Sequence, residues 1–214
     1  MKLKINVPSE LGEIKLSDYV KYLKVIEANE DDANSEVFIQ QKVLEIFCGI
    51  PLIDAVDYKM SDVRKVFNII TSTLNGKPEL VRTFKLGDTE FGFIPKLDDM
   101  TFGEYVDLDS NLGNWDNMYK AMAVLYRPIK QKVGDKYIIE EYRGDAYYDA
   151  MLHTPMDAVI SSMLFFYRLG IELSAAMTNY LEEEGTLEDS MLSQTSLING
   201  DGIKAYKHLL DSTF

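Results

Sequence analysis

The chain is poor in the residue types that most often carry chemistry. Its 214 residues include one cysteine, one tryptophan and two histidines. Cys48 has no second cysteine with which to form a disulfide inside the chain, which is typical of proteins from a reducing cytoplasm. It lies in the apolar run Val43-Leu-Glu-Ile-Phe-Cys48, and a thiol among apolar side chains is unreactive. We therefore interpret Cys48 as a packing residue of the core.

Motifs for nucleotide binding and for acid–base catalysis are also missing. The sequence contains no Gly-x-Gly-x-x-Gly and no Gly-Lys-Ser/Thr, the motifs whose loops bind nucleotide phosphates through backbone N–H groups. His153 and His208 are the only two histidines, and neither has a nucleophile pattern beside it. We expect both histidines to be structural or solvated.

Long uncharged runs are absent as well. The N-terminal sequence Met1-Lys-Leu-Lys-Ile-Asn lacks the apolar core of a signal peptide, and no stretch of 18 or more residues is free of charge. These features predict neither secretion nor a segment that spans a membrane.

Basic residues are scarce relative to acidic ones. The chain has 22 Lys and Arg against 35 Asp and Glu, which gives a net charge of −13. Because such a chain repels phosphate backbones, we expect no nucleic acid among its partners. Five carboxylates lie close together in the sequence, at Asp98, Asp99, Glu104, Asp107 and Asp109.

This acidic cluster has two interpretations. Divalent cations prefer oxygen ligands of this kind, but the chain is acidic throughout, and acidic residues at a helix start are stabilised by the helix dipole. We favour the second interpretation. The sequence therefore predicts no metal site, no cofactor and no catalytic residue, and hence a protein that is not an enzyme.

The overall composition is that of a folded globular protein. Hydrophobic residues make up 46% of the chain and charged residues 27%, with 13 Tyr and 10 Phe. We expect a single α+β domain, mostly helical, over residues 1–185. Residues 186–214 are expected to form a tail with a short amphipathic helix at about residues 202–210, which is either an arm or a docking peptide.

Part of the sequence is repeated. The segment Leu11-Gly-Glu-Ile-Lys-Leu-Ser-Asp-Tyr-Val20 returns as Leu97-Asp-Asp-Met-Thr-Phe-Gly-Glu-Tyr-Val106, at an offset of 86 residues. Each copy follows a short apolar stretch ending in proline and precedes a helical pattern, so we expect two strand–loop–helix units, residues 2–50 and 88–128, related by a pseudo-two-fold. The matched residues should then be buried in equivalent places: Leu11/Leu97, Ile14/Met100, Leu16/Phe102, Tyr19/Tyr105 and Val20/Val106.

Two short β-hairpins are expected elsewhere. Residues 81–86 and 89–94 alternate in polarity around Gly87-Asp88, and residues 129–133 and 136–142 do the same around Gly134-Asp135. A helix over residues 118–126 should end before Pro128.

The longest helical pattern is strongly apolar. Thr154-Pro155 is a typical helix start, and the following residues 156–183 carry large apolar side chains on nearly every side. Such a helix is either buried on several faces or in contact with other chains. We expect a long central C-terminal helix, and we take Phe166 and Met177 as its candidate contact residues.

A second candidate contact region precedes this helix. Trp115 and the run Met122-Ala-Val-Leu-Tyr-Arg-Pro128 contain the residue types that dominate binding hot spots, although core residues have a similar composition. Both interpretations stay open. The candidate partner-binding residues are Trp115, Tyr126, Arg127, Phe166 and Met177.

Several blocks of the sequence together resemble a family of small proteins encoded in tailed bacteriophage genomes. The resemblance rests on Met100-Thr-Phe-Gly-Glu-Tyr-Val-Asp-Leu-Asp, Trp115, Ala121-Met-Ala-Val-Leu-Tyr-Arg-Pro-Ile129, Met156-Asp-Ala-Val and Phe165-Phe-Tyr-Arg-Leu-Gly170. It covers most of the chain and is weakest near Asp31 and in the tail. Because such proteins belong to the virion structural and assembly genes, the resemblance implies a part in head or tail building.

Two roles follow from this resemblance. One is a virion component that multimerises, such as a ring or adaptor at the portal–tail junction, with other copies and portal or tail proteins as partners. The other is a tail-assembly chaperone, which binds a tail protein transiently and is absent from the mature particle; an acidic chain with 10 Met suits that role. Either role places the protein in the host cytoplasm during assembly, and the first also in the virion, without contact with a membrane.

Overall fold

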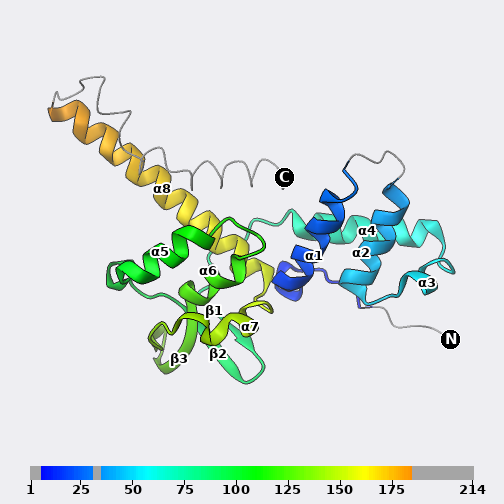
Figure 1. Cartoon of the computed structure of the whole chain (residues 1–214), viewed down its shortest axis with the longest axis horizontal. Coiled ribbons are helices and arrows are strands. Elements are labelled where there is room, and N and C mark those ends of the chain that lie inside the picture. Colours follow the sequence, from blue (N-terminus) through cyan, green and yellow to red (C-terminus); the bar gives the residue numbers. More distant parts are fainter. Residues whose placement is uncertain (1–5, 31–34, 185–214) are drawn as a thin grey trace.

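The computed structural model describes residues 6–30 and 35–184 of the chain. It is an α+β structure and mostly helical, which confirms the predicted fold class (Figure 1). The α-helices are α1 (Leu16–Glu27), α2 (Glu36–Cys48), α3 (Leu52–Ala55), α4 (Met60–Leu74), α5 (Phe102–Asn111), α6 (Met118–Leu125), α7 (Tyr148–Met151) and α8 (Met156–Glu184). The strands are β1 (Thr83–Leu86), β2 (Thr89–Phe93), β3 (Tyr126–Val133) and β4 (Lys136–Ile139), and the short 3₁₀ helices are η1 (Leu11–Glu13), η2 (Leu97–Asp99) and η3 (Gly144–Tyr147).

The four strands form one antiparallel sheet in the order β1-β2-β3-β4. Both predicted hairpins are confirmed, and the first residue of each turn is a glycine with positive φ, 58° at Gly87 and 60° at Gly134. Glycine adopts this conformation without the steric cost that a Cβ would bring. The long-range pairing of β2 with β3 aligns Phe91 with Pro128, so β3 begins earlier than the sequence predicts, directly after α6.

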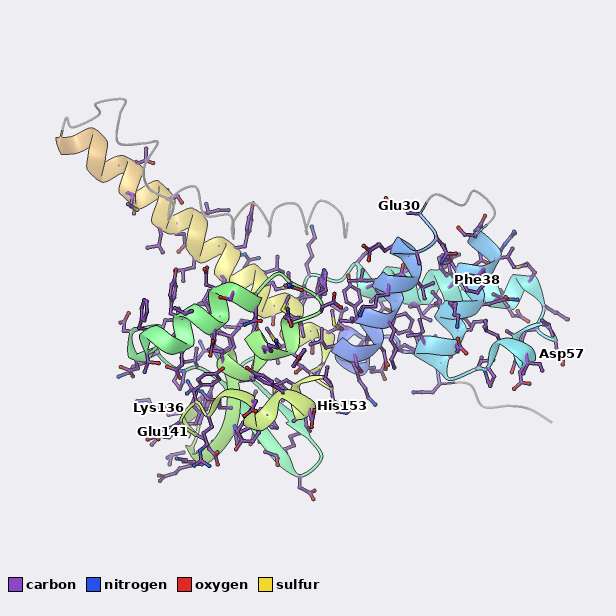
Figure 2. All side chains as sticks on the ribbon, in the orientation of Figure 1. Glu30, Phe38, Asp57, Lys136, Glu141 and His153 are labelled. Carbon is purple, nitrogen blue, oxygen red and sulfur yellow. The ribbon has the colours of Figure 1, made fainter. Side chains whose placement is uncertain are left out.

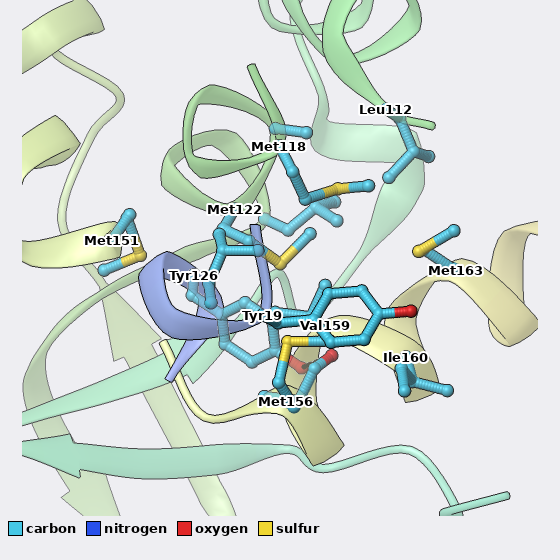
Figure 3. Close-up of a cluster of buried hydrophobic side chains, with 14 of the residues drawn as sticks. Tyr19, Leu112, Met118, Met122, Tyr126, Met151, Met156, Val159, Ile160 and Met163 are labelled. Atoms are coloured by element: carbon cyan, nitrogen blue, oxygen red, sulfur yellow. Dashed lines mark hydrogen bonds between the residues drawn. The ribbon is translucent and has the colours of Figure 1, made fainter. Parts of the chain in front are cut away.

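The helices lie in two groups. Helices α1 to α4 gather at one end of the molecule, and the sheet lies with α5, α6 and α7 at the other end (Figure 1). One core cluster joins them, because Tyr19 of α1 contacts the ring of Trp115 edge to face, with centroids 4.9 Å apart. Helix α6 contributes the most buried residues of this core, which includes Met118, Met122, Met151 and Met156 around Tyr126 (Figure 3).

The predicted N-terminal strand is not formed where the structure describes the chain. Residues 1–5 lie outside the described residues, and residues 6–8 are not in a strand. Instead, the segment before α1 pairs with the segment before α8. The backbone N–H of Leu16 donates to the Thr154 carbonyl at 2.9 Å, and the N–H of Met156 donates to the Ile14 carbonyl at 2.9 Å.

The sequence repeat is visible in the local backbone. Each copy forms a 3₁₀ helix and then an α-helix. The 3₁₀ helices η1 and η2 begin at residues 11 and 97, and the helices α1 and α5 begin at residues 16 and 102, so each pair is separated by the repeat offset of 86 residues. The residues between them are extended in both copies. The pseudo-two-fold relation between the larger units stays a prediction.

The environments of the two copies differ, so the expectation of equivalent burial is wrong. The side chain of Leu16 is 1% exposed and that of its counterpart Phe102 is 82% exposed. Tyr19 is buried, whereas Tyr105 and Val106 are exposed. The physical reason is that the segment before α8 and the first turns of α8 cover the first copy, while Phe102 and Tyr105 of α5 line an open groove.

Candidate partner-binding surface

Helix α8 has two halves with different surroundings. From Met156 to Met163 its side chains are buried in the core, except for the half-buried Asp157. Ser161 and Ser162 fix this half, because the Ser161 hydroxyl accepts from the Val81 N–H at 3.1 Å and the Ser162 hydroxyl donates to the Ala158 carbonyl at 2.7 Å. The first half is therefore a central helix, as predicted.

The second half of α8 extends beyond the rest of the molecule (Figure 1). Its apolar side chains Ile171, Leu173 and Met177 are exposed. By length and composition alone, Met156–Asn179 is apolar enough to cross a membrane. The first half of this helix is part of the core.

A groove with a volume of about 590 Å³ lies between α5 and α8. Its walls are apolar, with Asp109 as a charged side chain at the rim. Leu108 and Leu112 are buried, whereas Phe102 and Tyr105 are exposed. The main lining residues are Phe102, Tyr105, Leu108 and Leu112 from α5 and its C-terminal end, and Phe166, Leu169, Gly170 and Leu173 from α8.

The α8 side of the groove follows a regular spacing. Phe166, Gly170, Leu173 and Met177 are separated by four, three and four residues. This is the spacing of a coiled-coil seam, in which one apolar stripe of a helix faces a partner helix. The stripe begins in the groove at Phe166 and continues on the protruding half at Met177. We call the groove together with this stripe the α5–α8 surface.

Two of the five candidate residues lie on the α5–α8 surface. Phe166 is half-buried, packs edge to face on Phe165 with ring centroids 5.2 Å apart, and lines the groove. Met177 is exposed on the protruding half. Trp115 lies elsewhere, half-buried against Tyr19, so its contact with the core accounts for one side of its ring.

Tyr126 is a core residue, so the prediction that it binds a partner is wrong. Its side chain is fully buried, and its hydroxyl donates to the Val81 carbonyl at 2.7 Å and lies 3.1 Å from the Ser162 hydroxyl. Burial raises the pKa of this phenol above its usual range. The prediction failed because core residues and binding hot spots have a similar composition, so the residue type alone does not separate them.

Arg127 is also inside the protein, so the same prediction is wrong for it. Its Nη1 donates to Glu104 Oε1 at 2.7 Å, and both side chains are buried. Glu104 Oε2 accepts from the Thr101 N–H at 2.7 Å, while the Thr101 hydroxyl accepts from the Glu104 N–H, which completes a capping box at the start of α5. Arg127 therefore joins β3 to α5 and so positions one wall of the groove.

A second cavity, of about 610 Å³, lies between β4 and the segment from Ile94 to Glu104. Arg127 and Glu104 line it, and Arg127 Nε has no hydrogen-bond partner. The remaining charged lining residues are Lys96, Asp99, Glu140 and Glu141. Within residues 6–30 and 35–184, no three His, Cys, Asp or Glu side chains are grouped so that they could hold a metal ion.

The other reactive side chains lie apart from both cavities. Cys48 is half-buried at the end of α2, and burial raises the pKa of its thiol to about 11. His153 is exposed between α7 and α8 (Figure 2), and His208 lies outside the described residues. Neither Cys48 nor His153 lines either cavity.

Sequence reasoning missed Phe102 and Tyr105, which form the outer wall of the groove. The repeat predicts buried places for both, equivalent to those of Leu16 and Tyr19, but only Leu16 and Tyr19 are buried. One signal was available, since the repeat replaces an aliphatic Leu16 with the much larger Phe102.

Comparisons of the chain with protein families, with curated proteins and with solved structures found no match.

Proposed function

We propose that the protein is a multimeric structural component of a tailed bacteriophage, a ring or adaptor at the portal–tail junction. The observation that carries the proposal is the α5–α8 surface, where a groove and a helical stripe of apolar side chains face solvent. Exposed apolar patches of this kind mark interaction sites, because the burial of apolar surface is favourable by about 25 cal/mol of free energy per Å². The resemblance to phage virion proteins supports the biological setting.

A closed ring requires two different surfaces on each copy, because each subunit contacts its neighbours head to tail. A second exposed apolar surface lies at the opposite end of the molecule, on and after α3 (Figure 1). Its members are Ile53, Val56 and Met60, of which Ile53 is 79% exposed, and the neighbouring Asp57 marks this end in Figure 2. We propose that this α3 end of one copy contacts the α5–α8 surface of the next.

Light scattering on the full chain tests this proposal. The wild type should rise in mass with concentration from a monomer of 24.4 kDa. Leu173→Asp should keep the helical circular dichroism spectrum and stay monomeric, because Leu173 is 57% exposed and a charge there costs little until a partner covers it.

Val133→Asp is the matched control. Val133 is 70% exposed on the β3–β4 hairpin, away from both apolar surfaces, so this variant should assemble as the wild type does. The Met177→Lys variant should weaken assembly in the same sense as Leu173→Asp. A wild type that stays monomeric at every concentration, or equal assembly of all variants, would refute the proposal.

The chaperone role is the second candidate, since an apolar groove that ends in a flexible Met177 side chain also suits a transient, aggregation-prone partner. Mass spectrometry of purified particles separates the two roles. A virion component is present in a fixed number of copies, and a chaperone is absent from the particle.

A further inference from the structure

We propose that residues 202–210 of the same chain bind in the groove between α5 and α8 and cover it until a partner displaces them. The groove is the kind of site that takes an amphipathic helix, with apolar walls on two helices and the buried Leu108 and Leu112 beneath. The chain has a segment of this character after α8.

The sequence of this segment matches the groove in pattern. Ile203, Tyr206 and Leu210 are spaced by three and four residues, which places them on one face of a helix. Lys204 and Lys207 are the only Lys or Arg residues after Glu184. Lys204 lies away from that face, whereas Lys207, four residues after Ile203 and three before Leu210, lies at its edge.

The charges of the two surfaces are complementary. Asp109 lies at the rim of the groove, and Glu172 is exposed on α8 next to Leu173. Lys207, at the edge of the apolar face of residues 202–210, would therefore meet an acidic side chain at the rim.

The segment can reach the groove of its own chain. The groove residues of α8, from Phe166 to Leu173, precede Glu184 by 18 to 11 residues, a distance of about 17 to 27 Å along the helix. Residues 185–201 form a connection of 17 residues, which spans up to about 55 Å when extended. A tethered segment has an effective concentration on the order of millimolar, so the next copy has to displace it before the head-to-tail contact forms.

The consequence is control of access to the α5–α8 surface. A bound segment covers Phe102 and Tyr105, which are otherwise exposed, and a partner helix must displace it before it can enter the groove. This binding within one chain does not depend on the phage role, and the experiment below tests it separately from assembly.

Disulfide trapping in the full chain tests the proposal. Tyr105→Cys places a thiol at the exposed wall of the groove, and Ala205→Cys places one in the segment. The native Cys48 gives little background, because burial raises the pKa of its thiol to about 11. We expect mild oxidation to give an intrachain disulfide, seen as a faster-migrating monomer on a non-reducing gel.

Two further variants define the outcome. The matched pair Val133→Cys with Ala205→Cys should form at least tenfold less intrachain disulfide, because Val133 is exposed on the hairpin and not in the groove. Leu210→Asp, added to the Tyr105→Cys and Ala205→Cys pair, should reduce the yield to the level of that control. An interchain disulfide as the main product would show that a second copy fills the groove, and a yield equal to the control would show that the segment does not bind there; either result overturns the proposal.

Discussion

Among individual residues, Glu104 makes the contacts on which the groove depends. Its two carboxylate oxygens accept from Arg127 and from the Thr101 backbone, so one side chain caps α5 and ties this helix to β3. The pair is buried, and the desolvation of two charges is offset only while both partners are present. Arg127 Nε has no hydrogen-bond partner that could compensate for the loss of the bond from Nη1 to Glu104.

Removal of Glu104 should therefore be strongly destabilising. We expect Glu104→Ala to lower the free energy of unfolding in urea by about 3–5 kcal/mol, because it leaves the buried Arg127 charge unpaired. The control Glu90→Ala removes the partner of Lys132 on the sheet surface and should leave the unfolding curve close to that of the wild type. The double variant Glu104→Leu with Arg127→Met should recover part of the loss, and a double variant less stable than Glu104→Ala would contradict this account.

Cys48 is the residue whose chemistry depends most clearly on burial. Its pKa is raised to about 11 from the ordinary value of 9.0, so at pH 8 the folded protein holds far less thiolate than the unfolded chain. We expect alkylation of Cys48 at pH 8 to be about 10- to 100-fold slower in the native protein than in urea. Because the folded state favours the neutral thiol, the contribution of Cys48 to stability is present below pH 9 and is lost as the pH rises toward 11. Equal alkylation rates in the folded and unfolded states would contradict the burial.

Among the secondary structure elements, α1 and α5 show how far the sequence determines the structure. The matched residue types of the repeat correctly predict a loop followed by a helix in both copies, because turn and helix-start residues act within a few positions of the chain. Only α5 has a side-chain cap, at Thr101, whereas Lys15 before α1 makes none. The matched residue types fail to predict that Leu16 is buried and Phe102 exposed, because burial depends on which distant segment lies on top. The hairpins are predicted for the same local reason, through Gly87 and Gly134.

The matched positions of α1 and α5 provide a direct test of this difference. Leu16→Ala should lower the free energy of unfolding by about 2–5 kcal/mol, since it removes buried methyl groups and leaves a cavity. Phe102→Ala removes a larger side chain but should lower the free energy of unfolding less than Leu16→Ala does, because Phe102 is 82% exposed in the described structure and only the proposed binding of residues 202–210 would cover it. Urea denaturation of the two variants measures both values, and similar losses would mean that α5 is covered as α1 is.

Across the whole molecule, the central features are a main core, a smaller core cluster around Leu44, and two ends with exposed apolar side chains. The sequence predicts the core well, since the apolar runs of α6 and the first half of α8 supply most of its fully buried residues. It also predicts that α8 needs more contacts than a surface helix can make. It does not predict which half of α8 lacks them, because that depends on where β2, β3 and α6 end. Tyr126 and Arg127 were misplaced for the same reason, as the pairing of β3 with β2 takes both residues inside.

The two exposed ends have a consequence for assembly that a single contact surface would not have. If the α3 end of one copy binds the α5–α8 surface of the next, each of the variants Ile53→Asp and Leu173→Asp keeps one intact surface and loses the other. Alone, neither variant can form the contact. Mixed together, they can form it once, since the α3 end of Leu173→Asp fits the α5–α8 surface of Ile53→Asp.

Light scattering on this mixture tests the account most directly. At a concentration at which the wild type assembles, each variant alone should have the monomer mass of 24.4 kDa, and an equimolar mixture should reach twice that mass and no more. The mixed dimer should persist when Val133→Asp is combined with either variant, because Val133 lies outside the contact. Assembly of Ile53→Asp or Leu173→Asp alone to the wild-type mass, or a mixture that stays monomeric, would contradict the head-to-tail contact.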